Sequence, residues 1–158
     1  FFASRVISAF DGTIEKVVAL AALMPIVAGI AGNSGNQTLT LLVRSLATGQ
    51  ITESNQLDVI KKEVLVALIN GFIWGIIAGL FAWALYYNSP DGKLLGLTMF
   101  MAMMLNMLMG AVVAILVPLT LKKLGRDPAL GGSVLLTFIT DSGGFFIFLA
   151  LATYIFSV

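Results

Sequence analysis

Residues 131–146 read GGSVLLTFITDSGGFF and place one carboxylate, that of Asp141, inside an apolar run that continues to Val158. From Ala129 onward no other side chain carries a formal charge. A helix rises about 1.5 Å per residue, so Asp141 would lie near the middle of a bilayer about 30 Å thick. Because an ionisable group is costly at that depth, Asp141 indicates a functional site.

Two further oxygen-bearing side chains precede Asp141 at helical spacing. Steps of four residues back along the chain lead to Thr137 and Ser133, so the three share one face of the expected helix. Oxygen ligands suit a hard cation or a proton, which makes these three the candidate metal-binding residues. The structural alternative is a neutral Asp141 that is hydrogen-bonded to Thr137 or to another helix. Against it, Gly143 and Gly144 would let a second helix or a hydrated ion approach.

The composition is that of a membrane protein. Of the 158 residues, 59% are hydrophobic and 11% are charged, whereas a soluble domain carries about 25% charged residues. The long apolar runs lack the period-two alternation of a membrane barrel, which favours helices. We therefore expect an all-α integral membrane protein, a helical bundle that forms a single transmembrane domain over residues 1–158.

The residue inventory excludes several classes of function. A net charge of +1 gives no electrostatic basis for binding nucleic acid. The chain contains no Cys and no His, so it forms no disulfide, no thiolate metal site and no Ser–His or His–metal protease centre. We therefore expect a protein without enzymatic activity.

Apolar runs indicate where the chain crosses the membrane. Residues 1–10 look like the tail of a first membrane helix, and a polar turn is expected at residues 11–13. The remaining spans are expected at residues 17–47, with a bend at Pro25, at residues 64–87, at residues 94–121 and from Asp127 to the end. Thr52 or Ser54 is a candidate N-cap for the second of these spans, and Asp127, followed by Pro128, is one for the last.

Basic residues predict the orientation through the positive-inside rule. If the loops after the first and third full spans lie on the same side, that side holds the larger basic set, Arg44, Lys61, Lys62, Lys122, Lys123 and Arg126. The opposite side keeps Arg5, Lys16 and Lys93. We expect a multi-pass protein of the cell inner (plasma) membrane, with the Lys-rich loops in the cytoplasm and the C-terminus outside.

An unusual group of amides interrupts the first full span. One helical face carries four polar side chains that we interpret as pore-lining, namely Asn33, Asn36, Gln37 and Thr40. Amide and backbone oxygens on such a face suit the wall of a water-filled path for hydrated ions. The alternative is interhelical packing, in which Asn and Gln hydrogen-bond across helices and the neighbouring glycines permit close approach.

Two other patterns have structural explanations. Gly71, Gly75 and Gly79 recur every fourth residue, the small-xxx-small spacing of close helix packing. Met99, Met103 and Met107 form a stripe that resembles a copper site, but Met also fills apolar gaps and no Cys or His supports a soft metal. Asn106 is the one polar group in the middle of that helix and is expected to face inward, while Asn70 is expected near a helix end.

Three stretches together resemble the membrane domain of the MgtE family of magnesium channels. They are PIVAGIAGNSGNQTLTLLVRSLATG at residues 25–49, GRDPAL at residues 125–130 and TFITDSGGF at residues 137–145. The resemblance covers essentially the whole chain. It implies a five-helix membrane domain, of which this chain holds the end of the first helix and the other four, with cytosolic regulatory domains upstream of Phe1.

The resemblance also implies a homodimer whose ion path lies at the subunit interface. Asp141 falls on the family's pore-lining acidic residue, and Asn33, Asn36 and Gln37 fall on the facing wall. Mg²⁺ would then be both the transported and the bound ion, with membrane lipid and a second copy of the chain as partners. Many family members have a proline near Val134, so the Gly131-Gly132 pair is expected to replace that helix break or to soften it.

The residues support a Mg²⁺ channel and leave two alternatives. One is an ion-coupled secondary transporter in which Asp141 is protonated in each cycle. The other is a membrane scaffold whose glycines and amides serve only helix assembly. Selectivity among Mg²⁺, Mn²⁺ and Co²⁺ is not determined by the sequence, because oxygen ligands suit all three.

Overall fold

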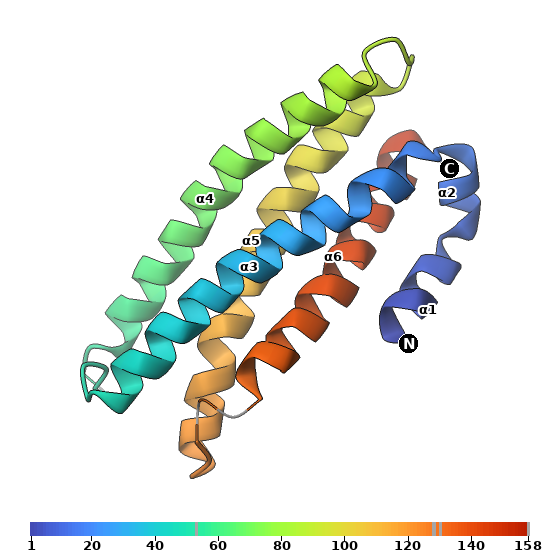
Figure 1. The fold of residues 1–158 in the computed structure, drawn as a ribbon. Coiled ribbons are helices and arrows are strands. Elements are labelled where there is room, and N and C mark those ends of the chain that lie inside the picture. The colour runs from blue at the N-terminus through green and yellow to red at the C-terminus, as the bar shows by residue number, and fades with distance from the viewer. Residues whose placement is uncertain (53, 128, 130, 158) are drawn as a thin grey trace.

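The computed structural model describes residues 1–52, 54–127, 129 and 131–157. Every regular element among them is a helix: α1 (Phe2–Ala9), α2 (Asp11–Lys16), α3 (Ala19–Ala47), α4 (Gln56–Leu85), α5 (Gly92–Lys123) and α6 (Gly132–Phe156). The long helices α3 to α6 run along one another as a bundle, and the short α1 lies against α6 (Figure 1). The predicted all-α membrane bundle is confirmed.

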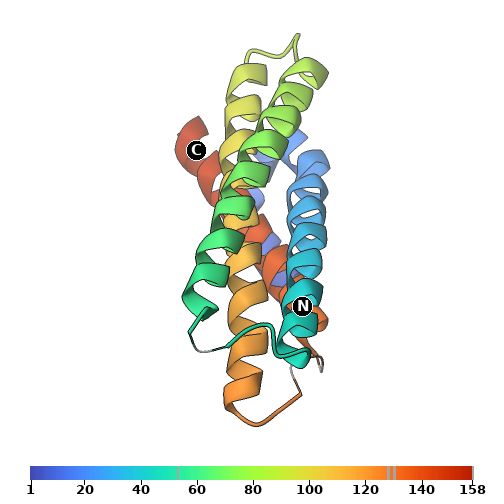
Figure 2. The same ribbon diagram turned by 90° about the vertical axis from the view of Figure 1, so that its left-hand side faces the viewer.

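Helix α5 occupies the centre of the bundle. It packs against each of the other long helices, while α4 makes little contact with α3. Figure 2 shows α4 and α5 side by side up to the turn that joins them. The bundle therefore consists of an α4–α5 pair and an α3–α6 pair, and α5 packs against both helices of the second pair.

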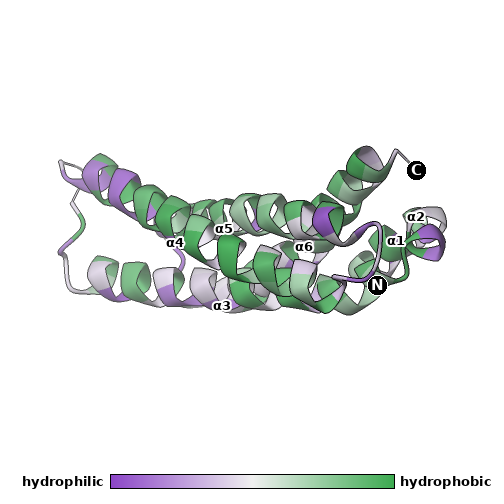
Figure 3. Ribbon diagram, turned by 90° about the horizontal axis from the view of Figure 1, so that it is seen from above, coloured by the Kyte–Doolittle hydropathy of each residue, from purple (hydrophilic) through white to green (hydrophobic). Residues whose placement is uncertain are grey.

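In the described part of the chain three helices are long and apolar enough to cross a membrane, namely α4, α5 and α6. Helix α3 has 29 residues and is long enough to cross, yet its glycines and amides keep it out of this group. Figure 3 shows the difference, with green over most of α4 and α5 and more white and purple along α3. Residues 19–47 of the predicted span 17–47 form one continuous helix that contains Pro25.

The main core lies between α3, α5 and α6. Its largest fully buried side chains include Phe148 from α6, Leu20 and Leu23 from α3, and Met99 and Met103 from α5. Met107 is also buried at 3% exposure, so the methionine stripe packs in the core. Among the described residues no group of three His, Cys, Asp or Glu side chains is placed to hold a metal ion.

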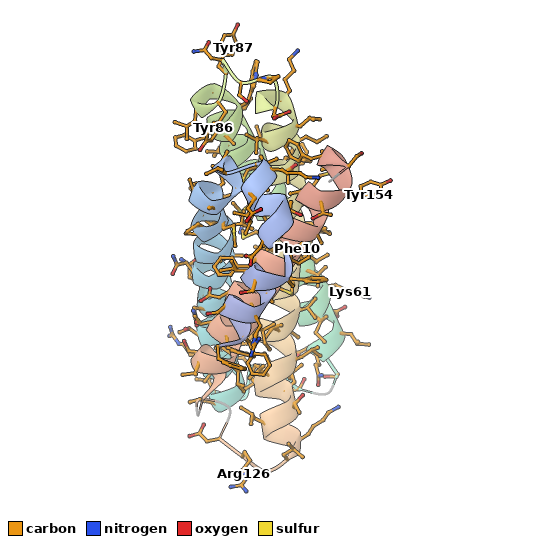
Figure 4. All side chains as sticks on the ribbon, turned by 90° about the vertical axis from the view of Figure 1, so that its right-hand side faces the viewer. Phe10, Lys61, Tyr86, Tyr87, Arg126 and Tyr154 are labelled. Carbon is orange, nitrogen blue, oxygen red and sulfur yellow. The ribbon has the colours of Figure 1, made fainter. Side chains whose placement is uncertain are left out.

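The loops alternate between the two ends of the bundle. The α3–α4 and α5–α6 connections lie at one end and the α4–α5 turn lies at the other (Figures 1 and 2). Figure 4 shows the same arrangement through side chains, with Tyr86 and Tyr87 at one end and Arg126 at the opposite end. The loops expected to share a side of the membrane therefore do share an end, and their cytoplasmic location stays a prediction.

Two local expectations near helix ends are wrong. Residues 11–13 form the first turn of α2, because the N–H groups of Thr13 and Ile14 bond to the carbonyl of Phe10. Helix α4 begins at Gln56 with Asn55 at the N-cap position, one residue beyond the proposed cap Ser54. The proposed caps Thr52 and Ser54 instead hydrogen-bond to each other at 2.9 Å.

The start of α6 and the place of Asn70 also differ from expectation. Asp127 is not the N-cap of α6, because that helix begins only at Gly132. Its Oδ1 accepts the N–H of Ala129 in the loop at 2.9 Å, and its neighbour Pro128 lies outside the described residues. Helix α6 begins at Gly132, after Gly131 with φ +73°, which glycine adopts without steric strain. The glycine pair thus forms the helix start. Asn70 lies in the middle of α4, not at its end.

Candidate cation-binding face

The α6 side of the candidate site is a row of three oxygen-bearing side chains. Ser133 and Thr137 are exposed and Asp141 is half-buried. They lie one helical turn apart because α6 is continuous from Gly132 to Phe156. On an adjacent side of the same helix Leu136 and Thr140 are fully buried against the bundle. The polar row therefore faces away from the core of this chain.

The α3 side presents the predicted amides. Asn33, Gln37 and Thr40 are exposed and Asn36 is half-buried. With Leu41 these four residues line an open groove on the surface of the chain. The Thr40 hydroxyl donates to the carbonyl oxygen of Asn36 at 2.8 Å and so stays on its own helix.

Asn36 joins the two helices through its side-chain amide. The hydroxyl of Ser133 donates to Asn36 Oδ1 at 2.7 Å, and Asn36 Nδ2 donates to Thr137 Oγ1 at 3.5 Å. The same Nδ2 also donates to the Gly32 carbonyl one turn earlier, at 3.1 Å. The structure thus brings Asn36, Ser133 and Thr137 together, although they are about a hundred residues apart in sequence.

Glycines allow α3 and α6 to approach closely behind this face. A Cβ built on Gly32 would lie 3.2 Å from Thr140 Oγ1, and one on Gly35 would lie 3.2 Å from the methyl groups of Leu136. Larger residues at either position would push the helices apart and stretch the hydrogen bonds of Asn36. Gly32 and Gly35 are therefore part of the geometry of the face.

Asp141 is the acidic group of the face. Asp141 continues the row of Ser133 and Thr137. Among the described residues its carboxyl group has no charged partner and no hydrogen bond. One chain therefore offers one carboxylate, three hydroxyls and several amides on an open surface. That set can hydrogen-bond the water shell of a hydrated cation, but it is too sparse to enclose a bare metal ion.

A second carboxylate near α3 was not singled out by the sequence. Glu63 on α4 accepts a hydrogen bond from the hydroxyl of Thr38 at 3.4 Å. The available signal was its position, because Glu63 directly precedes the apolar run of α4. Thr38 and Glu63 are both half-buried, between α3 and α4 and away from the open face.

The fold and the face together define a class of protein, a helical membrane protein with an oxygen-lined surface suited to hydrated cations. Residues 24–151 match the family model MgtE, described as a divalent cation transporter. The chain belongs to this family, which is a family of transporters and not of enzymes.

Three curated relatives are similar over nearly the whole chain, and each is named magnesium transporter MgtE. The protein of Thermus thermophilus is 32% identical over 151 residues, which is 94% of this chain. Those of Enterococcus faecalis and Bacillus subtilis are 30% and 28% identical, over 95% and 94% of it. In each case the matched segment is 32% of the relative, so the chain spans about a third of their length.

Proposed function

We propose that this chain is a membrane domain that conducts Mg²⁺ into the cytoplasm through a path between two copies of itself. The observation that carries the proposal is the row of exposed Ser133 and Thr137 and half-buried Asp141 beside Asn36 on otherwise apolar helices. A carboxylate and amides facing lipid would be strongly unfavourable, so this face requires a polar partner or water. A second copy in a two-fold dimer supplies both.

A two-fold axis beside α6 explains the single carboxylate. Each Asp141 gains the same residue from the other copy, and two carboxylates balance the charge of one Mg²⁺. Mg²⁺ dehydrates reluctantly and usually keeps several waters while one or two carboxylates hold it. The open face of hydroxyls and amides matches an ion that arrives with its water shell.

The side chains of the face have distinct roles in this proposal. Asp141 attracts the dication and disfavours anions, while the paired negative charges favour divalent over monovalent cations. Ser133 and Thr137 hydrogen-bond the ion's waters, and Asn33, Asn36, Gln37 and Thr40 form the facing wall. No bond to the protein is made or broken, so the step is movement of an ion along its gradient.

Removal of the carboxylate tests the proposal directly. Asp141→Asn keeps the size of the side chain and removes its charge, so Mg²⁺ uptake is expected to be abolished in cells that lack other Mg²⁺ importers. The matched control is Asp58→Asn, an exposed acid in the first turn of α4 that lies outside the face. Wild-type uptake by Asp141→Asn at equal expression would overturn the proposal.

Reconstituted vesicles separate electrodiffusion from coupled transport. With Mg²⁺ as the only gradient, the proposal predicts continued Mg²⁺ flux without a proton or sodium gradient. Flux that appears only when one of those gradients is imposed would assign a proton-coupled or sodium-coupled cycle to Asp141.

A further inference from the structure

Asn106 is a buried amide that the proposed ion path does not use. It lies in the middle of α5 at 0% exposure, between the buried Met103 and Met107. Its Nδ2 donates to the backbone carbonyl of Val27 on α3 at 3.1 Å. Its Oδ1 has no hydrogen-bond partner among the described residues.

This amide is a poor choice if stability alone matters. A buried carbonyl oxygen without a partner is destabilising, whereas leucine has a similar volume and no polar atom. In return, the amide makes a contact of fixed geometry. In the described part of the chain, the Asn106–Val27 bond is the one side-chain hydrogen bond between α5 and another helix.

Asn106 contacts α6 as well as α3. Gly144 of α6 lies directly over its amide, so that a Cβ there would overlap Nδ2. One turn further along α5, Gly110 faces the Ala31 carbonyl of α3 and the Thr140 methyl of α6, and a Cβ on Gly110 would lie 3.2 and 3.5 Å from them. Asn106 therefore sits where α3, α5 and α6 meet, in the interior of the bundle and not on the open candidate face.

Thr140 donates its hydroxyl to the Leu136 carbonyl of its own helix at 2.9 Å. The rest of this three-helix junction is apolar or glycine and does not fix how far one helix slides along another. Apolar helix surfaces pack in more than one register, and in lipid no hydrophobic force between helices selects among them. A single buried asparagine selects one register because any slip leaves its amide without the matching carbonyl. Here that carbonyl belongs to Val27, on the same rigid helix as Asn36.

We propose that Asn106 is a positioning residue that sets the height of α3 against α5 and α6, so that Asn36 lies level with Ser133 and Thr137. The expected effect of Asn106 on transport rests on the proposed function, whereas its expected effect on the α3–α6 register does not. Asn106 itself does not face the ion.

Disulfide cross-linking measures the register without any transport assay. The chain has no Cys, so Asn36→Cys with Ser133→Cys introduces the only two thiols, at positions whose side chains touch in the structure. Adding Asn106→Leu is expected to slow cross-linking about threefold to tenfold, the size of an interhelical hydrogen bond in a membrane. Asn106→Asp, whose neutral carboxyl group can still donate to Val27, is expected to restore the rate.

The matched control is Asn70→Leu, which removes a half-buried amide from α4 and is expected to leave cross-linking unchanged. An unchanged rate with Asn106→Leu, or equal slowing by Asn70→Leu, overturns the proposal. If Asn106→Leu does not fold, Gly144→Ala displaces the same amide, and an unchanged rate with that variant overturns the proposal equally.

Transport supplies the second readout, in a protein that keeps Asn36 and Ser133. Asn106→Leu is expected to raise the Mg²⁺ concentration for half-maximal uptake about threefold or more with unchanged thermal stability. Asn106→Asp is expected to keep that concentration close to the wild-type value. A parallel loss of stability and maximal rate, without a shift in that concentration, would make Asn106 merely structural. Slowed cross-linking combined with normal uptake by Asp141→Asn would overturn the proposed function and leave the positioning role standing.

Discussion

Helices α4 and α5 meet through glycines and apolar side chains, whereas α3 and α6 meet through glycines and hydrogen-bonded polar groups. In the first pair, Gly79 and Gly96 face each other so closely that a Cβ on either would lie 2.8 Å from the other's carbonyl oxygen. In the second pair, Asn36 bridges Ser133 and Thr137 on an open surface. The first contact fixes backbones, and the second arranges side chains.

The α4–α5 contact therefore supports the fold, whereas the α3–α6 face carries the candidate site. Helices α4 and α5 touch through their backbones without polar side chains. This contact, the α4–α5 seam, holds the two helices together but offers no group that could bind an ion. On the α3–α6 face, Asn36, Ser133 and Thr137 instead hydrogen-bond one another within the chain, and the face remains accessible to water or a partner. Changes at the seam should therefore reduce stability, and changes on the face should alter function with little loss of stability.

The largest effect on stability is expected at the α4–α5 seam. Gly79→Ala places a methyl group against the backbone of Gly96, which has no flexible end to move aside, and should lower the free energy of unfolding by about 1–3 kcal/mol. Gly29→Ala is the control, because nothing lies within 4 Å of its Cβ, and it should stabilise α3 by up to about 1 kcal/mol. Thermal unfolding in detergent compares the two, and equal stability would contradict a tight seam.

A smaller and sharper contrast is expected between two neighbouring glycines of α6. Gly144→Ala meets the amide of Asn106, which is held by Val27, and should be destabilising by about 1–3 kcal/mol. Gly143→Ala meets only the end of the flexible Met109 side chain and should be destabilising by less than about 1 kcal/mol. The same unfolding assay ranks them, and the reverse order would show that the Asn106 amide is free to move.

A weaker effect is expected where α2 packs on α6. The Thr153 hydroxyl donates to the Leu149 carbonyl, so the 2.8 Å bond between Thr13 and Thr153 is donated by Thr13. Thr13→Val removes that bond but leaves the Thr153 hydroxyl paired, so stability should fall by only about 0.6 kcal/mol. Thr153→Val, which also removes the bond to Leu149, serves for comparison. A larger loss from Thr13→Val would mean that α2 is a major support of the bundle.

The smallest effect on stability is expected on the α3–α6 face itself. Ser133→Ala removes an exposed hydroxyl and should change the free energy of unfolding by no more than about 0.5 kcal/mol. Mg²⁺ uptake should nevertheless fall about threefold, because Asn36 loses one of the bonds that orient it. Ser4→Ala on α1 is the control for both assays. Unchanged uptake with Ser133→Ala would remove Ser133 from the proposed path.

The long helices and the polar stripes followed from sequence because lipid permits few alternatives. A run that crosses a bilayer must satisfy its own backbone hydrogen bonds, so apolar length predicts a helix. Helical spacing then places Ser133, Thr137 and Asp141 on one face. Helix ends were less predictable, since Thr52, Ser54 and Asp127 found partners in their own loops instead of capping a helix.

By itself the sequence determined a membrane bundle, an inward-facing Asn106 and two polar stripes, because these depend on local periodicity and on the cost of polar groups in lipid. Only the tertiary structure decided that Asn36 meets Ser133 and that Asn106 meets the Val27 carbonyl. Such pairs depend on the rotation and height of each helix against the next. Those are set by packing between residues far apart in the chain, which no local pattern encodes.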